Sequence, residues 1–532
     1  MKKILIFLLV VSAVTPTFGK AVENEMYFRA MKDEMNRTLK ELRLPGELRP
    51  YYVAYHLNEK YRFHADATFG EVYASDKDDF DLNMIGMLKI GNDKNNNTGY
   101  YNRDRSWHYR AFANVIGHSY EGICQALWDT TNALYLEVIE QYKEKEAYRK
   151  QKNIQEQKPD VVPAPQGTYL EEIPAWSEPN REEINRWLEK VSSWGKELPF
   201  AEDFYVRAEK KQKNNYYLNS RGAKSQFFKI FYEIGASIQF RQPNGWIEKF
   251  RTAIPLRDFS EAELARAEQK IQEFLEKMHG LYGASQAEVY LGPVLYKPLS
   301  AGIFIQELLT NNLIPTVPLW QPNGEDEEAG PFRKRLGRRV MSPGITVYDR
   351  PRLKEYEGVQ LTGSSWLDWE GVPTQELVLV ADGRLQNLPL SQRPLEKAKG
   401  HQSNGHALSI LGNGGVREDV SNIFVEPETP LTDEQMEEKL LARCKELDLE
   451  YCYIKNDSVF ERIYTKDGRK EWIIGLNEIH KTERSLRDIL AAGGKKEIVN
   501  GYMVVPSLLV DEVELEPQDR KPDRKPLVPK PQ

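Results

Sequence analysis

The chain has 532 residues, of which 40% are hydrophobic, so it can bury more than one core and two domains are the natural expectation. Its 73 Lys and Arg residues are outnumbered by 80 Asp and Glu residues, which gives a formal net charge of −7. The basic residues form no long stripe interleaved with aromatic side chains, so the sequence argues against direct nucleic-acid binding.

The first twenty residues have the pattern of a secretory signal peptide. Lys2 and Lys3 precede an apolar run from Ile4 to Val14, and small residues at Thr17 and Gly19 follow it. The run is too short to favour a membrane span, and no other segment approaches about 20 uninterrupted apolar residues. We therefore expect residues 1–20 to be a signal peptide and the mature protein to be exported, periplasmic or extracellular, with no membrane span after signal removal.

The three cysteines are Cys124, Cys444 and Cys452. An odd count leaves at least one thiol unpaired, and so few cysteines cannot make a disulfide scaffold. Cys444 and Cys452 could pair, but their spacing fixes no geometry, and buried thiols that act as small apolar groups are the simpler interpretation.

The first half of the mature chain alternates amphipathic helices with strand-like runs. Apolar residues recur every three or four positions in 23–44, which predicts a first helix, and 51–58 and 64–75 read as strands. A second helix is predicted from Tyr120 to Gln157, where the proline-rich segment after it stops it. Ser119 precedes that helix in "GHSYEG", which lacks the second glycine of a nucleophile elbow, so we interpret it as the start of the helix.

The same order then repeats in outline. A helix over 181–193 precedes two more strand-like runs, and a long helix covers 260–281. Thr68-Phe69-Gly70 and Ser220-Arg221-Gly222 each place a hydroxyl residue two positions before a glycine, as tight hairpins do. The repetition suggests an internal duplication.

After residue 286 the sequence changes to β-rich segments with many glycines and prolines. We predict an α+β protein of two domains, an N-terminal domain over 21–284 with a sheet and long helices, and a β-rich C-terminal domain over 285–515. Residues 516–532, rich in Pro, Lys and Arg, have too little apolar surface to fold and are expected to be a disordered tail.

Several segments of the second domain resemble the TldD/PmbA family, also called modulators of DNA gyrase. They are "AEVYLGPVLYKPLSAGIFIQELL", "FRKRLGRRVMSPGITVYDRP", "LDWEGVPTQELVLVADGRLQNLPLSQRP" and the closing "MVVPSLLVDEVEL". The N-terminal half is similar more loosely, through "HADATFGEVYAS" and "YLNSRGA". The order and spacing of the pieces make the resemblance specific.

The resemblance implies a metallopeptidase scaffold whose zinc site is degenerate in this chain. Active members of that family carry a helix with H-E-x-x-x-H and a cysteine near the C-terminus as third ligand. Here Gln306 and Asn311 stand at the two histidine positions around Glu307, and no cysteine lies between Lys496 and Val513. Neutral amide oxygens are poor zinc ligands, and without a metal-bound water Glu307 is a remnant and not a confident catalytic residue.

"HQSNGH" offers His401 and His406 as further candidate ligands, but no third ligand is near in sequence, so we interpret this segment as a structural loop.

We therefore expect an exported homologue of the metallopeptidases that is inactive alone and acts as a non-catalytic subunit of a peptide-processing complex. The resemblance implies dimerisation, with a metal-bearing relative or with itself, and contact with unfolded peptides. Zinc would be present only in the partner subunit. The alternative is an active peptidase that uses a site the sequence does not reveal.

Overall fold

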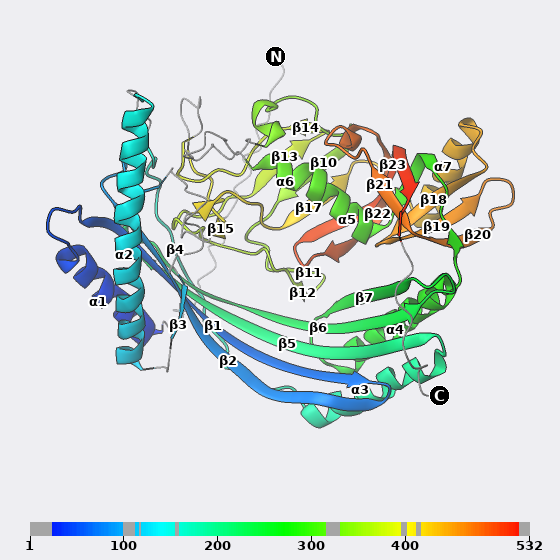
Figure 1. The fold of residues 1–532 in the computed structure, drawn as a ribbon, viewed down its shortest axis with the longest axis horizontal. Coiled ribbons are helices and arrows are strands. Elements are labelled where there is room, and N and C mark those ends of the chain that lie inside the picture. The colour runs from blue at the N-terminus through cyan, green and yellow to red at the C-terminus, as the bar shows by residue number, and fades with distance from the viewer. Residues whose placement is uncertain are drawn as a thin grey trace, which may run out of the picture.

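The computed structural model describes residues 24–98, 112–115, 119–154, 159–314, 330–394, 402–410 and 416–520. Two large β-sheets dominate it, and Figure 1 shows the first curving beneath the second domain. The expected signal peptide, residues 1–20, lies outside the described residues.

The first sheet has seven strands in the order β3-β2-β1-β5-β6-β4, with β7 also paired to β6. Its four long strands form two antiparallel hairpins, whose inner strands β1 and β5 pair with each other. The strands are β1 (Pro50–Thr68), β2 (Glu71–Ile90), β3 (Phe112–Asn114), β4 (Thr168–Leu170), β5 (Ala201–Asn219), β6 (Lys224–Arg241) and β7 (Ile247–Leu256).

Both predicted hairpin turns are confirmed. Phe69 and Gly70 take positive φ angles of 44° and 84° between β1 and β2, as a two-residue turn of the right twist requires. Gly222, with φ 97°, lies between β5 and β6.

Four helices pack on one face of this sheet. They are α1 (Glu25–Glu41), α2 (Tyr120–Gln151), α3 (Arg181–Ser193) and α4 (Glu261–Leu281). Side chains alternate along a strand, so Phe204, Val206 and Ala208 of β5 face α3 and α4, whereas Arg207 and Lys211 point to the opposite face. Figure 1 shows α3 on the side of the sheet turned away from the second domain. The sheet therefore presents its polar face to that domain.

The second sheet has twelve strands and is mixed. Its longest strand, β23, pairs antiparallel with β9, β21 and β22 and parallel with β17. The strands are β8 (Ser285–Gln286), β9 (Tyr290–Tyr296), β10 (Ile345–Asp349), β13 (Leu377–Ala381), β14 (Arg384–Leu385), β17 (Ile423–Pro427), β18 (Tyr451–Asn456), β19 (Val459–Tyr464), β20 (Lys470–Ile474), β21 (Leu476–Ile479), β22 (Ile489–Val499) and β23 (Met503–Pro517).

Helices α5 (Pro298–Ile305) and α7 (Asp433–Glu446) pack against this sheet, and α4 of the first domain also contacts its strand β20. Two small two-stranded sheets complete the domain, β11 (Glu355–Tyr356) with β12 (Val359–Gln360) and β15 (Ser409–Ile410) with β16 (Val416–Arg417). The predicted α+β class is confirmed, since a helix-covered antiparallel sheet is followed by a β-rich mixed sheet.

One predicted boundary is wrong, because the second helix ends at Gln151 and not at Gln157. At the start of the expected tail, β23 continues to Pro517, and Arg520 packs over the Trp246 ring while its Nη1 donates to Glu248 Oε1 at 2.8 Å. Sequence composition missed this because the arginine is held by contacts with β7, which is distant in sequence. Residues 521–532 of that tail lie outside the described residues.

Three further features bear on the sequence predictions. Ser119 caps α2, accepting a hydrogen bond from the Gly122 backbone N–H at 3.0 Å, as its interpretation as a helix start requires. Cys124, Cys444 and Cys452 are free thiols, and Cys444 of α7 and Cys452 of β18 are buried in the same apolar cluster. Among the described helices, none has the length and apolar character to span a membrane.

Candidate functional site

The helix that carries Gln306, Glu307 and Asn311 contains a π-turn. It begins as α5, continues as η3 (Gln306–Thr310) with π geometry, and ends as α6 (Asn311–Leu313). In an ideal α-helix, residues five apart lie roughly 140° apart around the axis. In the π-turn the Asn311 N–H donates to the Gln306 carbonyl, which brings these two positions onto one face. Single-turn π-bulges are often found at functional sites.

The opposite face of this helix anchors it in the core. Phe304, Ile305, Leu308, Leu309 and Leu313 are buried in the cluster that fills the second domain, whereas Glu307 and Asn311 are exposed. The polar face therefore stays accessible on a rigid support.

A second element reaches Gln306 from the β22–β23 hairpin. Asn500 and Gly501 take positive φ angles of 53° and 77° in its turn, which suits an Asn-Gly pair. The Asn500 side chain donates from Nδ2 to Gln306 Oε1 at 2.8 Å. The amide oxygen of Gln306 is thus already occupied by a hydrogen bond.

Glu307 forms an ion pair with Lys481, which also contacts Glu478 at 3.1 Å. Burial alone would raise the pKa of Glu478, but the ammonium groups of Lys455 and Lys481 outweigh it and lower that pKa. Burial would lower the pKa of Lys481, but Glu307 and Glu478 outweigh it and raise that pKa. The carboxylate that the resemblance assigns to base catalysis is therefore held by a permanent cation.

These residues do not fit a zinc ion. The side chains at the π-turn are neutral amides, Gln306 bonded to Asn500 and Asn311 on the same helix face as Gln306, whereas catalytic zinc takes imidazole, thiolate or carboxylate ligands. Throughout the described ranges, no group of three His, Cys, Asp or Glu side chains is arranged to hold a metal.

The first sheet approaches this site through Lys229 of β6. Lys229 donates from Nζ to the Thr362 carbonyl at 2.7 Å, and the Thr362 N–H donates to the Gly501 carbonyl at 2.8 Å. Burial, together with the nearby charge of Lys213, lowers the pKa of Lys229 to about 7. The sheet and the Asn500-Gly501 turn are thus linked by two successive hydrogen bonds.

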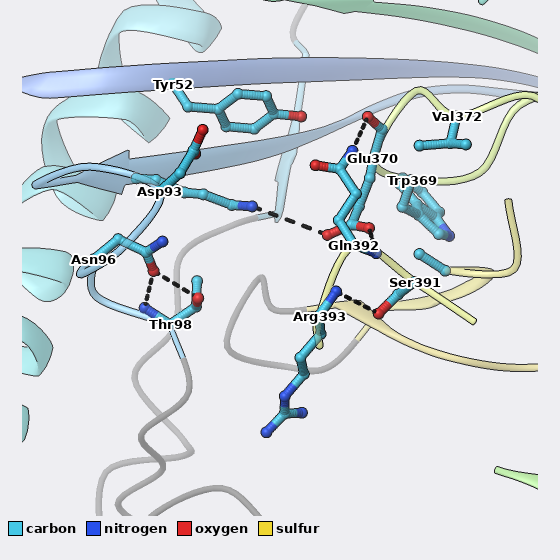
Figure 2. Close-up of polar contacts among 12 residues, drawn as sticks. Tyr52, Asp93, Asn96, Thr98, Trp369, Glu370, Val372, Ser391, Gln392 and Arg393 are labelled. Carbon is cyan, nitrogen blue, oxygen red and sulfur yellow. Dashed lines mark hydrogen bonds and ion pairs between the residues drawn. The ribbon is translucent and has the colours of Figure 1, made fainter. Parts of the chain in front are cut away.

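A second polar cluster lies at the junction of the domains, and Figure 2 shows its surroundings. We call Lys89, Asp93, Arg221, Glu370 and Gln392 the junction cluster. Arg221 pairs with Asp93 and donates to Gln392 Oε1 at 3.2 Å, while Lys89 Nζ lies 4.0 Å from Glu370 Oε1. The backbone N–H of Gln392 donates to Glu370 Oε2 at 2.6 Å.

Two charges of the junction cluster, those of Lys89 and Glu370, are buried. Burial lowers the pKa of Lys89 and raises the pKa of Glu370, although each partner's charge opposes the shift of the other. Its first three members come from the first domain and the other two from the second. Two of the contacts, Arg221 with Gln392 and Lys89 with Glu370, join one domain to the other, so the cluster works as a latch between them.

His406 is fully buried, and its ring contacts the Asn404 carbonyl through Nδ1 at 3.0 Å and Asp349 through Nε2 at 3.4 Å. His401 lies outside the described residues.

Sequence reasoning placed the helix but missed what the fold brings to it. Asn500, Lys481 and Lys229 are remote from Gln306 in sequence, and no local pattern marks them as its neighbours. The Asn-Gly pair was a readable hairpin signal, but only the sheet register brings that hairpin beside the helix.

The second domain is similar to a known protein family. Residues 292–516 match the family model described as the PmbA/TldA metallopeptidase C-terminal domain, so this part of the chain is similar to the C-terminal domain of those metallopeptidases. No curated protein matches the chain significantly.

Solved structures match over both domains. TldE from Thermococcus kodakarensis is 14% identical with a TM-score of 0.58, and the match covers 91% of this chain and 99% of that one. A protein proposed to modulate a DNA gyrase, from Thermotoga maritima, is 14% identical with a TM-score of 0.60, covering 92% and 100%. Another protein so described, from Bacteroides thetaiotaomicron, is 11% identical with a TM-score of 0.57, covering 92% and 98%. At these identities the likeness concerns the fold.

Proposed function

We propose that this chain is an exported, metal-free relative of the PmbA/TldD metallopeptidases that serves as the non-catalytic subunit of a peptide-processing assembly. The observation that carries the proposal is the bonded pair of Gln306 and Asn500, which places two amides where a metal centre would need strong donors. Glu307 supports it, since its carboxylate is paired with Lys481.

The chemistry of peptide hydrolysis gives the reason. A zinc-bound water loses its proton near neutral pH and a neighbouring carboxylate accepts it, whereas free water at an amide cluster keeps its proton. The chain therefore lacks the nucleophile even though it keeps a carboxylate at the corresponding position.

The shared fold would allow the chain to act as a structural subunit even without hydrolysing peptides itself. Both domains keep the fold of the matched structures over nearly their whole length. We infer that the chain supplies part of the wall that encloses a peptide, while a metal-bearing relative, or a second copy, completes the assembly. A stable pairing of this kind buries more than about 1,000 Å².

Co-expression with a relative that carries H-E-x-x-x-H tests the subunit role. We expect one complex in size-exclusion chromatography with mass detection, and faster cleavage of an unfolded fluorogenic peptide than the relative achieves alone. The same relative with its glutamate changed to Gln serves as the inactive control. If the chain elutes as a monomer at micromolar concentration and leaves the relative's activity unchanged, the subunit role fails.

Export is a separate part of the proposal and rests on the pattern of residues 1–20. We expect the mature chain to begin within a few residues of Lys20. The intact mass of the protein purified from its native source decides this, because a mass that includes Met1 to Phe18 contradicts export by this route.

A further inference from the structure

Three lysines lie side by side across the first sheet. Lys60 of β1 is the register partner of Lys213 of β5, which is in turn the partner of Lys229 of β6. We call these three residues the lysine row. Register partners project from the same face of a sheet.

The lysine row faces the second domain. Tyr217, on the same face of β5, donates from its hydroxyl to the Trp369 carbonyl at 3.0 Å, and Lys229 itself bonds the Thr362 carbonyl. Through Thr362 and Gly501 the row adjoins the turn that holds Asn500 against Gln306. A ligand on the row would therefore lie beside the degenerate site.

Like charges directly opposite one another destabilise a sheet. At one end of the row, Asp81 is the register partner of Lys60. Glu209, two residues before Lys211 on β5, already forms ion pairs with Arg62 and Lys211. Among the described residues, no carboxylate bonds to Lys213 or Lys229.

The repulsion between Lys213 and Lys229 therefore lowers the stability of the ligand-free protein. Burial, then the charges of Lys60 and Lys211, lowers the pKa of Lys213, although Glu209 opposes this. Burial and Lys213 lower the pKa of Lys229 to about 7. An anion placed between them would remove this repulsion and restore their charge.

We propose that the lysine row binds side-chain carboxylates of an extended acidic peptide segment, so that the assembly receives unfolded segments rich in Asp and Glu. This inference names a substrate class and rests on the proposed function. Neighbouring strands lie about 4.8 Å apart, so the row presents single charges spaced along a line, and flexible lysines can reach carboxylates at alternate residues of a strand.

The direct test is peptide binding by the full mature chain. The probe is a fluorescein-labelled decapeptide of alternating Glu and Ser, compared with the same peptide carrying Gln or Lys in place of Glu. We expect only the acidic peptide to bind, with an affinity that falls steeply as salt rises. Equal binding of the Gln peptide, or tighter binding of inorganic tripolyphosphate or single-stranded DNA than of the Glu peptide, overturns the proposal.

The variant Lys213→Gln with Lys229→Gln removes the two unpaired charges. Each charge-assisted contact contributes roughly tenfold in affinity, so we expect about a hundredfold weaker binding. Lys32→Gln with Lys150→Gln is the control, since it removes two exposed lysines on α1 and α2 and makes the same change in net charge. Equal effects of the two variants would contradict a specific site. Loss of like-charge repulsion should leave the first variant at least as stable as the wild type.

Proton uptake separates the row from a general charge effect. Because the free Lys229 has a pKa of about 7 and a bound carboxylate raises it, binding at pH 7.5 takes up protons, and affinity falls as pH rises from 6 to 8. Lys229→Arg keeps its charge throughout, so it should bind without that pH dependence. An unchanged pH profile in Lys229→Arg contradicts the assignment. Failure of all peptide binding in a chain that still assembles with its relative would reject this inference and leave the subunit role intact.

Discussion

Gln306 and Asn500 differ from zinc ligands in the atoms they present. An imidazole offers a nitrogen lone pair of high metal affinity, whereas an amide oxygen is already satisfied by the neighbouring amide N–H. The family resemblance assigns Gln306 and Asn311 to the two histidine positions of the zinc motif, and that assignment stays a prediction. Sequence reasoning could not identify Asn500, since only the hairpin brings that side chain to the helix.

At the scale of a residue, Glu307→Gln tests whether the carboxylate has kept a catalytic role. We expect the activity of the assembled complex to change by no more than a small factor, because Lys481 holds this carboxylate and no acidified water faces it. Stability should change by less than about 1 kcal/mol, since the Glu307 side chain is exposed and Lys481 keeps its contact with Glu478. The measurements are peptide cleavage and urea unfolding, with Lys481→Gln as the matched control. A hundredfold loss of activity with the fold intact would show that Glu307 acts as a general base.

At the scale of elements, the helices and long hairpins were predictable and the site's geometry was not. Periodicity and turn residues gave α1, α3, α4 and both hairpins of the first sheet, because those signals are local. The π-turn left no such signal. The buried face of this helix packs in the core of the second domain, whose partners come from strands remote in sequence.

Rebuilding a metal centre tests whether the two elements still hold the geometry of one. Gln306→His, Asn311→His and Asn500→His together supply three imidazoles, and histidine tolerates the positive φ at residue 500. We expect about one zinc per chain, measured by elemental analysis and by competition with a chromophoric chelator.

A matched control comes from the neighbouring residue. Asn312 points elsewhere, since its Nδ2 donates to the Glu307 and Leu308 carbonyls at 3.0 Å. Substituting His at 312 in place of 311 should therefore abolish the gain. If both triple variants bind zinc equally, the π-turn does not position residue 311 as described.

At the scale of the whole molecule, the junction cluster holds the domains together. The contact between Lys89 and Glu370 could not be predicted from the sequence. The two residues lie in different domains, and no local sequence pattern marks either of them as part of an ion pair. Long-range pairing of this kind is fixed only once both domains have folded.

The variant Glu370→Ala tests whether the junction cluster stabilises the contact between the domains. Removing one partner leaves Lys89 buried without its counter-charge, so we expect a loss of roughly 3 kcal/mol in unfolding free energy. Replacing both Lys89 and Glu370 with Met should recover most of that loss. Lys190→Gln, which breaks the exposed pair with Glu268, should cost less than about 1 kcal/mol and serves as the control. A Glu370→Ala variant as stable as the wild type in urea would mean that the cluster does not hold the domains.

The metal content of the purified mature chain tests the central claim most directly. The protein is dialysed mildly, without chelator, and its zinc and iron are measured by elemental analysis against protein concentration. Because the site offers amides where a metal centre needs strong donors, we predict far less than one metal ion per chain. About one tightly bound zinc per chain would contradict the account.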